Sequence, residues 1–319
     1  MHSLPDNSSI QSIHFSYEQF HFMSAALLVL PDFLIIIFGW VFNRKLGFSR
    51  DFFVSLEKLI YYVLFPALLF QSIVRVPISM STAAELFFAT AAVAACGIIL
   101  SWLAWPILRA PSLAMASLAQ CGYRFNTYIA LALAPGLAGA SGQAVMALIV
   151  GFAVPIVNLA AIYALARHQG VGFVGALLRN PLLVSTVLGL AFNLAGLQLP
   201  QFLDILFGKL GVAAIGLGIL CVGASLLWEP GETNFKLIGW MLAIKLIFLP
   251  ICAWLICDYF ALSTVERQML ILFAAMPPAT AAYVLTVRMG GDARAVSLLI
   301  SIGTPLSALT LPLWLSLIS

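Results

Sequence analysis

The sequence has little charge for its length. Of its 319 residues, 8% are Asp, Glu, Lys or Arg, whereas 63% are hydrophobic. Average globular proteins carry about 25% charged residues, so this composition excludes a soluble domain. A net charge of +3, spread over the connections between apolar stretches, is explained by membrane topology alone, and we therefore expect no nucleic-acid partner.

The apolar part of the sequence also lacks the residues that most membrane enzymes need. The four histidines lie in the N-terminal tail, at the edge of the first apolar stretch or in a connection: His2, His14, His21 and His168. Without an imidazole in the interior, neither a zinc site nor a Ser-His pair can form there. The five cysteines lack metal-ligand spacing and are expected to be packing residues. No Gly-rich loop followed by Lys is present, so we expect no enzyme, no metal and no cofactor.

Ten apolar stretches fill nearly the whole length instead. Each is long enough, at roughly 18 to 25 residues, to cross the ~30 Å hydrocarbon core as a helix. They cover residues 21–42, 55–74, 84–108, 113–133, 143–166, 181–199, 202–227, 235–257, 267–287 and 294–318. The sequence thus predicts an all-α polytopic protein with ten transmembrane helices in a lipid bilayer, preceded by an extracytoplasmic tail over residues 1–20.

A weak internal repeat divides the chain into halves. A shift of about 150 residues places Pro31 on Pro181 and Gly39 on Gly189. Each half holds five helices, and because five is odd, the second half must enter the membrane from the opposite side. We expect two inverted five-helix repeats, 21–166 and 181–319, joined by a cytoplasmic linker over residues 167–180. Inverted repeats are typical of secondary transporters, whose sites lie near the midplane at discontinuous helices.

The fourth and ninth stretches are interrupted at matching positions. A shift of 151 places Asn126 on Pro277 and Thr127 on Pro278. Two consecutive prolines remove backbone donors, and unwound backbone at this depth is tolerated only where it lines a cavity. Asn126 and Thr127 can cap the half-helix that follows them, and its N-terminal amides suit an anion. We therefore expect broken fourth and ninth helices that cross at the midplane.

The candidate substrate-binding residues cluster at these two breaks. Arg124 lies near the midplane, where a lone charge costs ~2.5–3.5 kcal/mol even on lenient insertion scales. Its charge predicts attraction of an anion, with a structural pair or snorkelling toward cytoplasmic water as the alternative. The prolines shape the site, and the other polar side chains can bond a ligand. The full set is Arg124, Asn126, Thr127, Gln120, Pro277, Pro278, Thr280 and Tyr283.

Two further ionisable residues are candidates for coupling. Lys245 lies some ten residues into the eighth stretch, where it either bonds to a polar group of the core or takes part in coupling. Asp32 belongs toward the outer leaflet according to the repeat and is a candidate for proton coupling. Three buried amides, Gln71, Asn158 and Asn193, are expected to bond to neighbouring helices.

Several segments carry a family resemblance. RFNTYIALALA at 124–134, NPLLVSTVLGLAFN at 180–193 and AAMPPATAAYVL at 274–285 resemble the matching segments of the auxin efflux carrier family of permeases, which includes bacterial malonate-type transporters. The resemblance implies two crossing helices, a scaffold of the first, second, sixth and seventh helices, and elevator-like transport of organic anions. Asn126 matches the family's Asn at the first crossover. Tyr128 and Ala281 depart from it, since members often have Gly and Asn there.

These observations predict a secondary active transporter of a small organic anion, driven by protons or by the membrane potential, in a cytoplasmic (inner) membrane. The scaffold helices are the candidate surface for a homodimer. The alternatives are a sodium-coupled organic-anion symporter of similar architecture, an anion channel and a membrane sensor. The symporter requires more carboxylates near the crossover than the sequence supplies.

Lys and Arg are unevenly distributed among the connections. Ten of the fifteen follow the odd-numbered stretches, whereas the even-numbered connections and the termini hold only Arg75, Lys209 and Arg267. The positive-inside rule therefore places the odd-numbered connections in the cytoplasm and both termini outside.

This orientation predicts the labelling of introduced cysteines. A cysteine between Arg44 and Arg50 should react with a membrane-impermeant maleimide only from the cytoplasmic side, and one at Ser9 only from outside. The measurement compares sealed vesicles of the two orientations, with the parent chain as the background. Reversed labelling would contradict the predicted topology.

Overall fold

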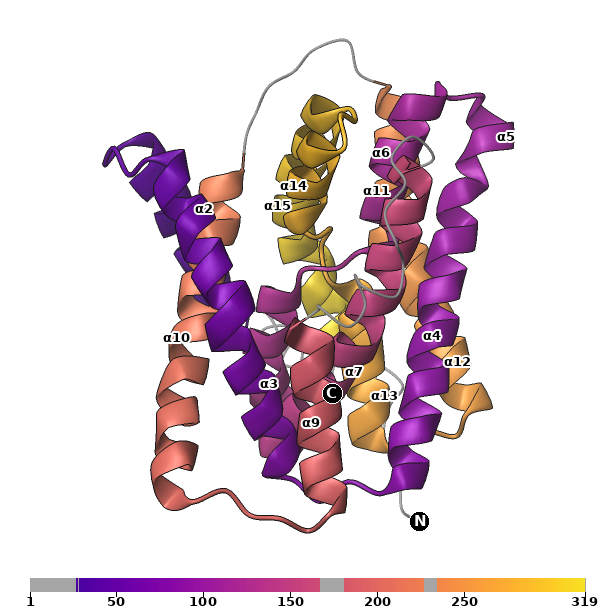
Figure 1. Ribbon diagram of the computed structural model, residues 1–319. Helices are drawn as coiled ribbons and strands as arrows, with labels where there is room; N and C mark the ends of the chain where they lie inside the picture. Colours follow the sequence, from indigo (N-terminus) through magenta and orange to yellow (C-terminus); the bar gives the residue numbers. More distant parts are fainter. Residues whose placement is uncertain (1–26, 28, 167–180, 227–233, 319) are drawn as a thin grey trace, which may run out of the picture.

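The computed structural model describes residues 27, 29–166, 181–226 and 234–318. The predicted tail over 1–20 and linker over 167–180 lie outside the described residues. Every named element in the described part is helical (Figure 1). Six described helices are long and apolar enough to cross a membrane: Arg50–Val74, Met80–Leu108, Thr127–Leu165, Gln201–Ser225, Phe235–Tyr259 and Ala293–Ile318. The chain is thus an all-α, multi-pass membrane protein.

One group of helices gathers around α3 (Phe65–Val74). The π-helical turn η1 (Ile60–Leu64) joins α3 to α2 (Arg50–Leu59), and α3 packs against α9 (Pro181–Leu194) and α10 (Gln201–Ser225). The helix over 29–44 crosses α10 at very close range. A Cβ added at Gly223 would lie 1.8 Å from the carbonyl oxygen of Ile36, so this crossing requires glycine.

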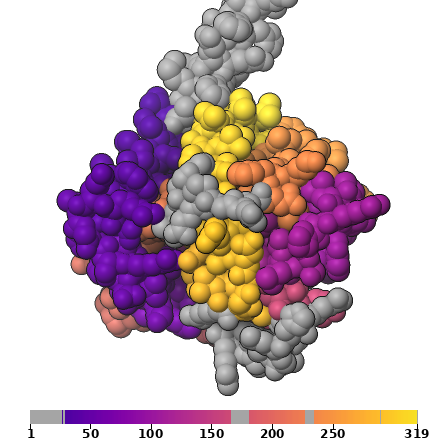
Figure 2. All heavy atoms as spheres, turned by 90° about the horizontal axis from the view of Figure 1, so that it is seen from above, coloured from indigo at the N-terminus to yellow at the C-terminus, as the bar shows by residue number. Residues whose placement is uncertain are grey.

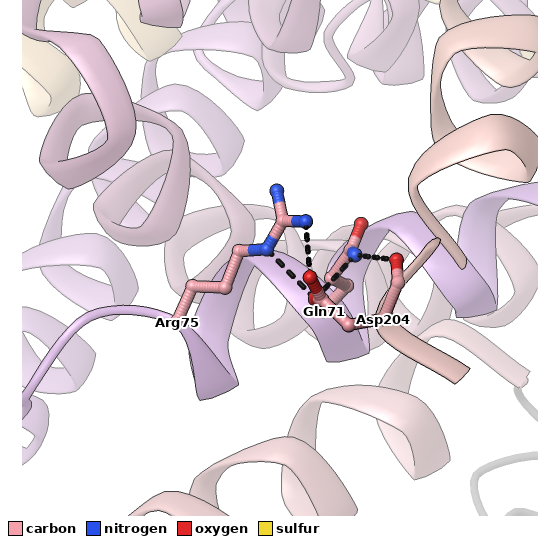
Figure 3. Close-up of polar contacts among 3 residues, drawn as sticks. All are labelled: Gln71, Arg75 and Asp204. Carbon is pink, nitrogen blue, oxygen red and sulfur yellow. Dashed lines mark hydrogen bonds and ion pairs between the residues drawn. The ribbon is translucent and has the colours of Figure 1, made fainter. Parts of the chain in front are cut away.

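Polar side chains fasten α3 to α10 and α9. Figure 3 shows Arg75 and Gln71 converging on Asp204 in the first turn of α10. The Arg75 guanidinium donates through Nε and an Nη to the two carboxylate oxygens at 2.9 and 2.7 Å, and Gln71 Nε2 donates to Oδ1 at 2.7 Å. Asn193 Nδ2 donates to the main-chain carbonyls of Ile73 in α3 and of Val76 just after it, at 2.7 and 2.6 Å. The prediction that Gln71 and Asn193 bond to neighbouring helices is confirmed.

A second group of helices lies on the opposite side of the molecule. Figure 1 places α4, α5, α11 and α12 there, with α13, α14 and α15 toward the middle. Seen from above, the gold segment of α14 and α15 lies between the indigo and the magenta parts of the chain (Figure 2). The bounds are α4 Met80–Trp102, α5 Ala104–Leu108, α6 Ser112–Tyr123, α11 Phe235–Ala243, η2 Ile244–Phe248, α12 Leu249–Tyr259, α13 Thr264–Ala275, α14 Ala281–Arg288 and α15 Ala293–Ile318.

The segment α7 (Thr127–Ala166) consists of two helices that meet at a non-helical kink, and it contacts α3 and α9 of the first group as well as α4 and α13 of the second. It bends at Ala138 and Gly139, where Gly139 has φ 59° and ψ −147°. Glycine adopts this backbone conformation readily because glycine has no Cβ. The predicted stretch 113–133 therefore consists of α6 and the start of α7, and the stretch 143–166 is the remainder of α7.

Both predicted interruptions are present in the structure. α6 ends at Tyr123 and α7 begins at Thr127, whereas α13 ends at Ala275 and α14 begins at Ala281. The two breaks lie against each other, because the Asn126 N–H donates to the Pro277 carbonyl at 2.9 Å. Phe125 and Pro278 also form an isolated antiparallel bridge.

The prolines are expected to keep α13 and α14 apart. Each costs about 3 kcal/mol relative to alanine inside a helix, so replacing Pro277 and Pro278 together by Ala should favour one continuous helix. Amide hydrogen exchange followed by mass spectrometry should then show slow exchange across residues 276–281. Pro305→Ala, inside the already continuous α15, is the control and should leave this segment unchanged. Rapid exchange that persists in the double variant would contradict the role of the prolines.

Candidate functional site

A cavity of about 90 Å³ lies where the two breaks meet. Its wall combines η1 and α3, the two breaks, both parts of α7, and α9. The lining residues are Tyr61, Phe65, Arg124, Phe125, Asn126, Thr127, Tyr128, Val154, Val157, Asn158, Leu182, Ala279, Thr280 and Ala281. Four of the predicted site residues, Arg124, Asn126, Thr127 and Thr280, are thus brought together around one space.

Arg124 is held in the first break by a chain of side-chain hydrogen bonds. It is 7% exposed, and its Nη1 donates to Gln120 Oε1 at 2.7 Å. The Gln120 amide is oriented in turn by Thr286 of α14, because Nε2 donates to Thr286 Oγ1 at 2.9 Å. The Thr286 hydroxyl donates to the main-chain carbonyl one turn earlier, so its oxygen is left to accept from Gln120. Side chains from both broken segments therefore place the charge.

Asn126 caps the half-helix that begins α7. Its Oδ1 accepts from the main-chain N–H groups of Tyr128 and Ile129 at 3.1 and 3.3 Å, as an N-cap asparagine does. The side chain is 2% exposed. Within the described residues, its Nδ2 has no hydrogen-bond partner. A buried donor without a partner costs about 1–3 kcal/mol, so this amide favours an acceptor brought in from outside the chain.

The charged and amide groups at the first break favour negative charge. Five N–H groups belong to a guanidinium, and among the described residues Gln120 is the one side chain that hydrogen-bonds to that of Arg124. Two ion pairs occur among the described residues, Arg75–Asp204 and Arg267–Asp258, and both lie on helices other than α6 and α7. The N-terminal end of α7 adds a positive partial charge. Together these groups match the oxygens of an anion.

The other predicted site residues support the cavity from behind or lie away from it. Gln120 orients Arg124, and Pro277 accepts the hydrogen bond from the Asn126 main chain, but neither lines the cavity. Pro278 contributes to the bridge with the first break. Tyr283 is turned toward α2, where the Arg50 guanidinium carbon lies 4.9 Å from its ring centroid.

The two coupling candidates do not line the cavity either. Lys245 belongs to η2 and is fully buried. Its Nζ donates to the Ala274 carbonyl at 3.0 Å, and Nζ lies 5.9 Å from the centroid of the Phe273 ring. The Lys245 amino group is thus placed at the C-terminal end of α13, beside the second break. Asp32 lies in the helix over 29–44 and is partly buried.

Four aromatic residues of the cavity were not predicted as site residues, and one of them, Phe125, lies in the first break. Tyr61 and Phe65 come from η1 and α3, and Tyr128 begins α7. The sequence carries one local signal for Tyr61, since it lies five residues before Pro66, just as Lys245 lies five residues before Pro250. Both positions fall in π-helical turns, which are frequent at functional sites.

One amide side chain was also missed as a site residue, and one carboxylate near these elements lies outside the cavity lining. Asn158, expected to bond to a neighbouring helix, lines the cavity. Glu57 lies one turn before Tyr61 in a spanning helix and is partly buried. Within the described residues, no group of three or more His, Cys, Asp or Glu side chains is placed to hold a metal ion.

The chain resembles known transport proteins. Residues 173–315 match the family described as Membrane transport protein. Over 295 residues the chain is 25% identical to a protein of Rhizobium meliloti (strain 1021) named "Putative malonate transporter", with 89% of this chain and 92% of that protein covered. The predicted resemblance to the auxin efflux carrier family of permeases is thereby confirmed, and it identifies this multi-pass membrane protein as a transporter and not an enzyme.

Proposed function

We propose that the protein is a secondary active transporter of a small organic anion, such as a carboxylate, which binds in the cavity between the two breaks. The observation that carries this proposal is the buried, unpartnered Nδ2 of Asn126 beside Arg124, a cation without a carboxylate partner among the described residues. The name of the Rhizobium meliloti relative, "Putative malonate transporter", supports the same class of substrate.

The electrostatics of the site favour binding of an anion over a neutral ligand. Moving a cation from water into an apolar interior is costly unless an opposite charge pairs with it. The Arg124 guanidinium instead donates to the neutral amide of Gln120, at 2.7 Å. A carboxylate in the cavity supplies the missing charge, accepts from the guanidinium in a two-point geometry, and offers an acceptor to Asn126.

We propose elevator-like alternating access as the mechanism. The cavity is lined by Tyr61, Phe65 and Leu182 from the α3 group and by both breaks from the other group, so it lies at the boundary of the two. Relative movement of the groups would expose the breaks to one side of the membrane and then the other. Two inverted five-helix repeats, 21–166 and 181–319, fit such movement, since discontinuous helices meet near the midplane in transporters of this kind.

We propose that the transporter lies in a cytoplasmic membrane with both termini outside. The uneven distribution of Lys and Arg among the connections supports this orientation. The α3 group presents exposed apolar side chains, among them Phe202 and Val212 of α10, and these helices remain the proposed surface for a homodimer.

Proton or potential coupling is preferred over sodium coupling because of Lys245. In transporters with discontinuous helices, the C-terminal ends of half-helices coordinate the coupling cation. Here the Lys245 ammonium already donates to the Ala274 carbonyl at that end of α13. A sodium-coupled symporter is the second candidate, with Asp32 and Glu57 as the partly buried carboxylates. An anion channel and a membrane sensor are the third and fourth candidates.

The proposed substrate class is tested by binding of acetate, malonate and succinate to the purified protein. We expect Arg124→Gln to weaken binding of the best carboxylate roughly tenfold to hundredfold, since a charge-assisted hydrogen bond contributes ~1.5–3 kcal/mol. Arg124→Lys should restore part of the loss because it returns the charge without the planar fork. Lys209→Gln, which removes an exposed cation from α10, is the control. Equal affinity of Arg124→Gln and the parent would assign Arg124 a structural role.

The coupling proposal is tested in proteoliposomes. Replacing sodium by potassium at constant ionic strength should leave the initial rate of anion uptake unchanged, whereas collapsing an imposed proton gradient and membrane potential should abolish accumulation. Liposomes without protein provide the background. A rate that falls with the sodium concentration would favour the symporter.

A further inference from the structure

The Tyr128 ring occupies a slot between the crossover and the α3 group. Tyr128 is the second residue of α7 and lines the cavity. Its main-chain N–H donates to Asn126 Oδ1 at 3.1 Å, so its backbone is fixed by the cap of the half-helix. The ring therefore starts from a defined position beside the anion site.

Two neighbours hold the ring from the α3 group. The ring of Phe65, at the start of α3, lies 4.9 Å from it between centroids, at an interplanar angle of 38°. On α10, a Cβ added at Gly218 would lie 2.2 Å from Tyr128 Cδ1 and 2.7 Å from Cε1. Heavy atoms do not approach so closely, so the ring fits only because position 218 carries no side chain. Phe65 and Gly218 thus leave the ring little freedom to move out of the cavity wall.

The cavity bounded by this ring is small. Pockets for drug-sized ligands measure about 300–1,000 Å³, whereas this one measures about 90 Å³. A single water molecule needs about 10–15 Å³ of cavity space, so the space suits an anion of few heavy atoms. Its polar end is determined by Arg124 and Asn126, and an aromatic wall lies against the α3 group.

We propose that Tyr128 sets the upper size limit of the transported anion, with Gly218 as the residue that gives the ring its place. The proposal rests on the proposed anion site and adds to it a residue that selects by chain length. Tyr128 excludes longer anions because its ring, packed between Phe65 and Gly218, cannot turn aside. The ring acts by shape, so its hydroxyl is not required.

The experiment measures binding of malonate, succinate, glutarate and adipate, which differ by single methylenes, to the purified full chain. One methylene in a closely fitting pocket changes binding affinity roughly 10- to 200-fold. We expect the affinity of the parent protein to fall by such a factor at one chain length of the anion. Tyr128→Ala should move the drop to a longer anion by at least one methylene. Tyr128→Phe, which keeps the ring, should leave unchanged the chain length at which affinity falls.

The slot is tested by a pair of glycine variants on the same helix. Gly218→Ala should push the ring into the cavity and weaken binding of even the shortest anion. Gly216→Ala is the matched control, since a Cβ there meets nothing within 4 Å. The double variant Tyr128→Ala with Gly218→Ala should regain binding relative to Gly218→Ala and accept the longer anions. Thermal unfolding of each variant establishes that it is folded.

Different outcomes separate this proposal from the proposed function. If the parent binds a short anion and Tyr128→Ala shows the same chain-length limit, the proposal for Tyr128 is overturned while the anion site stands. A Gly218→Ala variant that binds with the affinity of the parent also overturns the proposal. The ring would then not depend on the absence of a side chain at position 218. If the parent binds neither acetate nor any of the four anions, the proposed substrate class and the size limit fail together, whereas binding of acetate alone overturns only the size limit set by Tyr128.

Discussion

The structure depends on a main-chain hydrogen bond between two interrupted helices, from the Asn126 N–H to the Pro277 carbonyl at 2.9 Å. Unpaired backbone groups are costly in an apolar interior, and the two breaks satisfy each other in a complementary way. Pro277 and Pro278 lack N–H groups and offer only carbonyls, whereas the first break contains no proline and supplies the donor. Each break therefore supplies a hydrogen-bond partner to the other, so fewer backbone groups are left unpaired in the apolar interior.

The same contact explains how a buried cation can be kept in place. Arg124 directly precedes the bridged residues, and its guanidinium is oriented through Gln120 by Thr286 of α14. Both broken segments thus contribute to one charged position. Removing a partner of a buried charge is strongly destabilising, and here the fixed charge is left with donors directed at a small cavity. Structural stability and anion recognition draw on the same residues.

Two prolines shape the helices around this centre in a similar manner. Phe65 N–H bonds to the Ile60 carbonyl before Pro66, and Leu249 N–H bonds to the Ile244 carbonyl before Pro250, so each helix widens by one residue. A proline cannot donate to the carbonyl four residues earlier and its ring crowds that group, which accounts for the wider turn. One widened turn carries Tyr61 of the cavity, and the other carries Lys245 beside α13.

The sequence by itself determined the membrane class, both helix breaks, and the placement of Arg124 and Asn126 at the first of them. These features have local causes: long apolar runs, consecutive prolines, and charge where it is costly. Only the tertiary structure decided which side chains share the cavity. It brought Tyr61 and Tyr128 into the wall and turned Tyr283 toward α2. It also ended α9 at Leu194, before the predicted residue 199. Helices far apart in the chain meet through shape and packing, and a local pattern of residue types carries no record of which faces will meet.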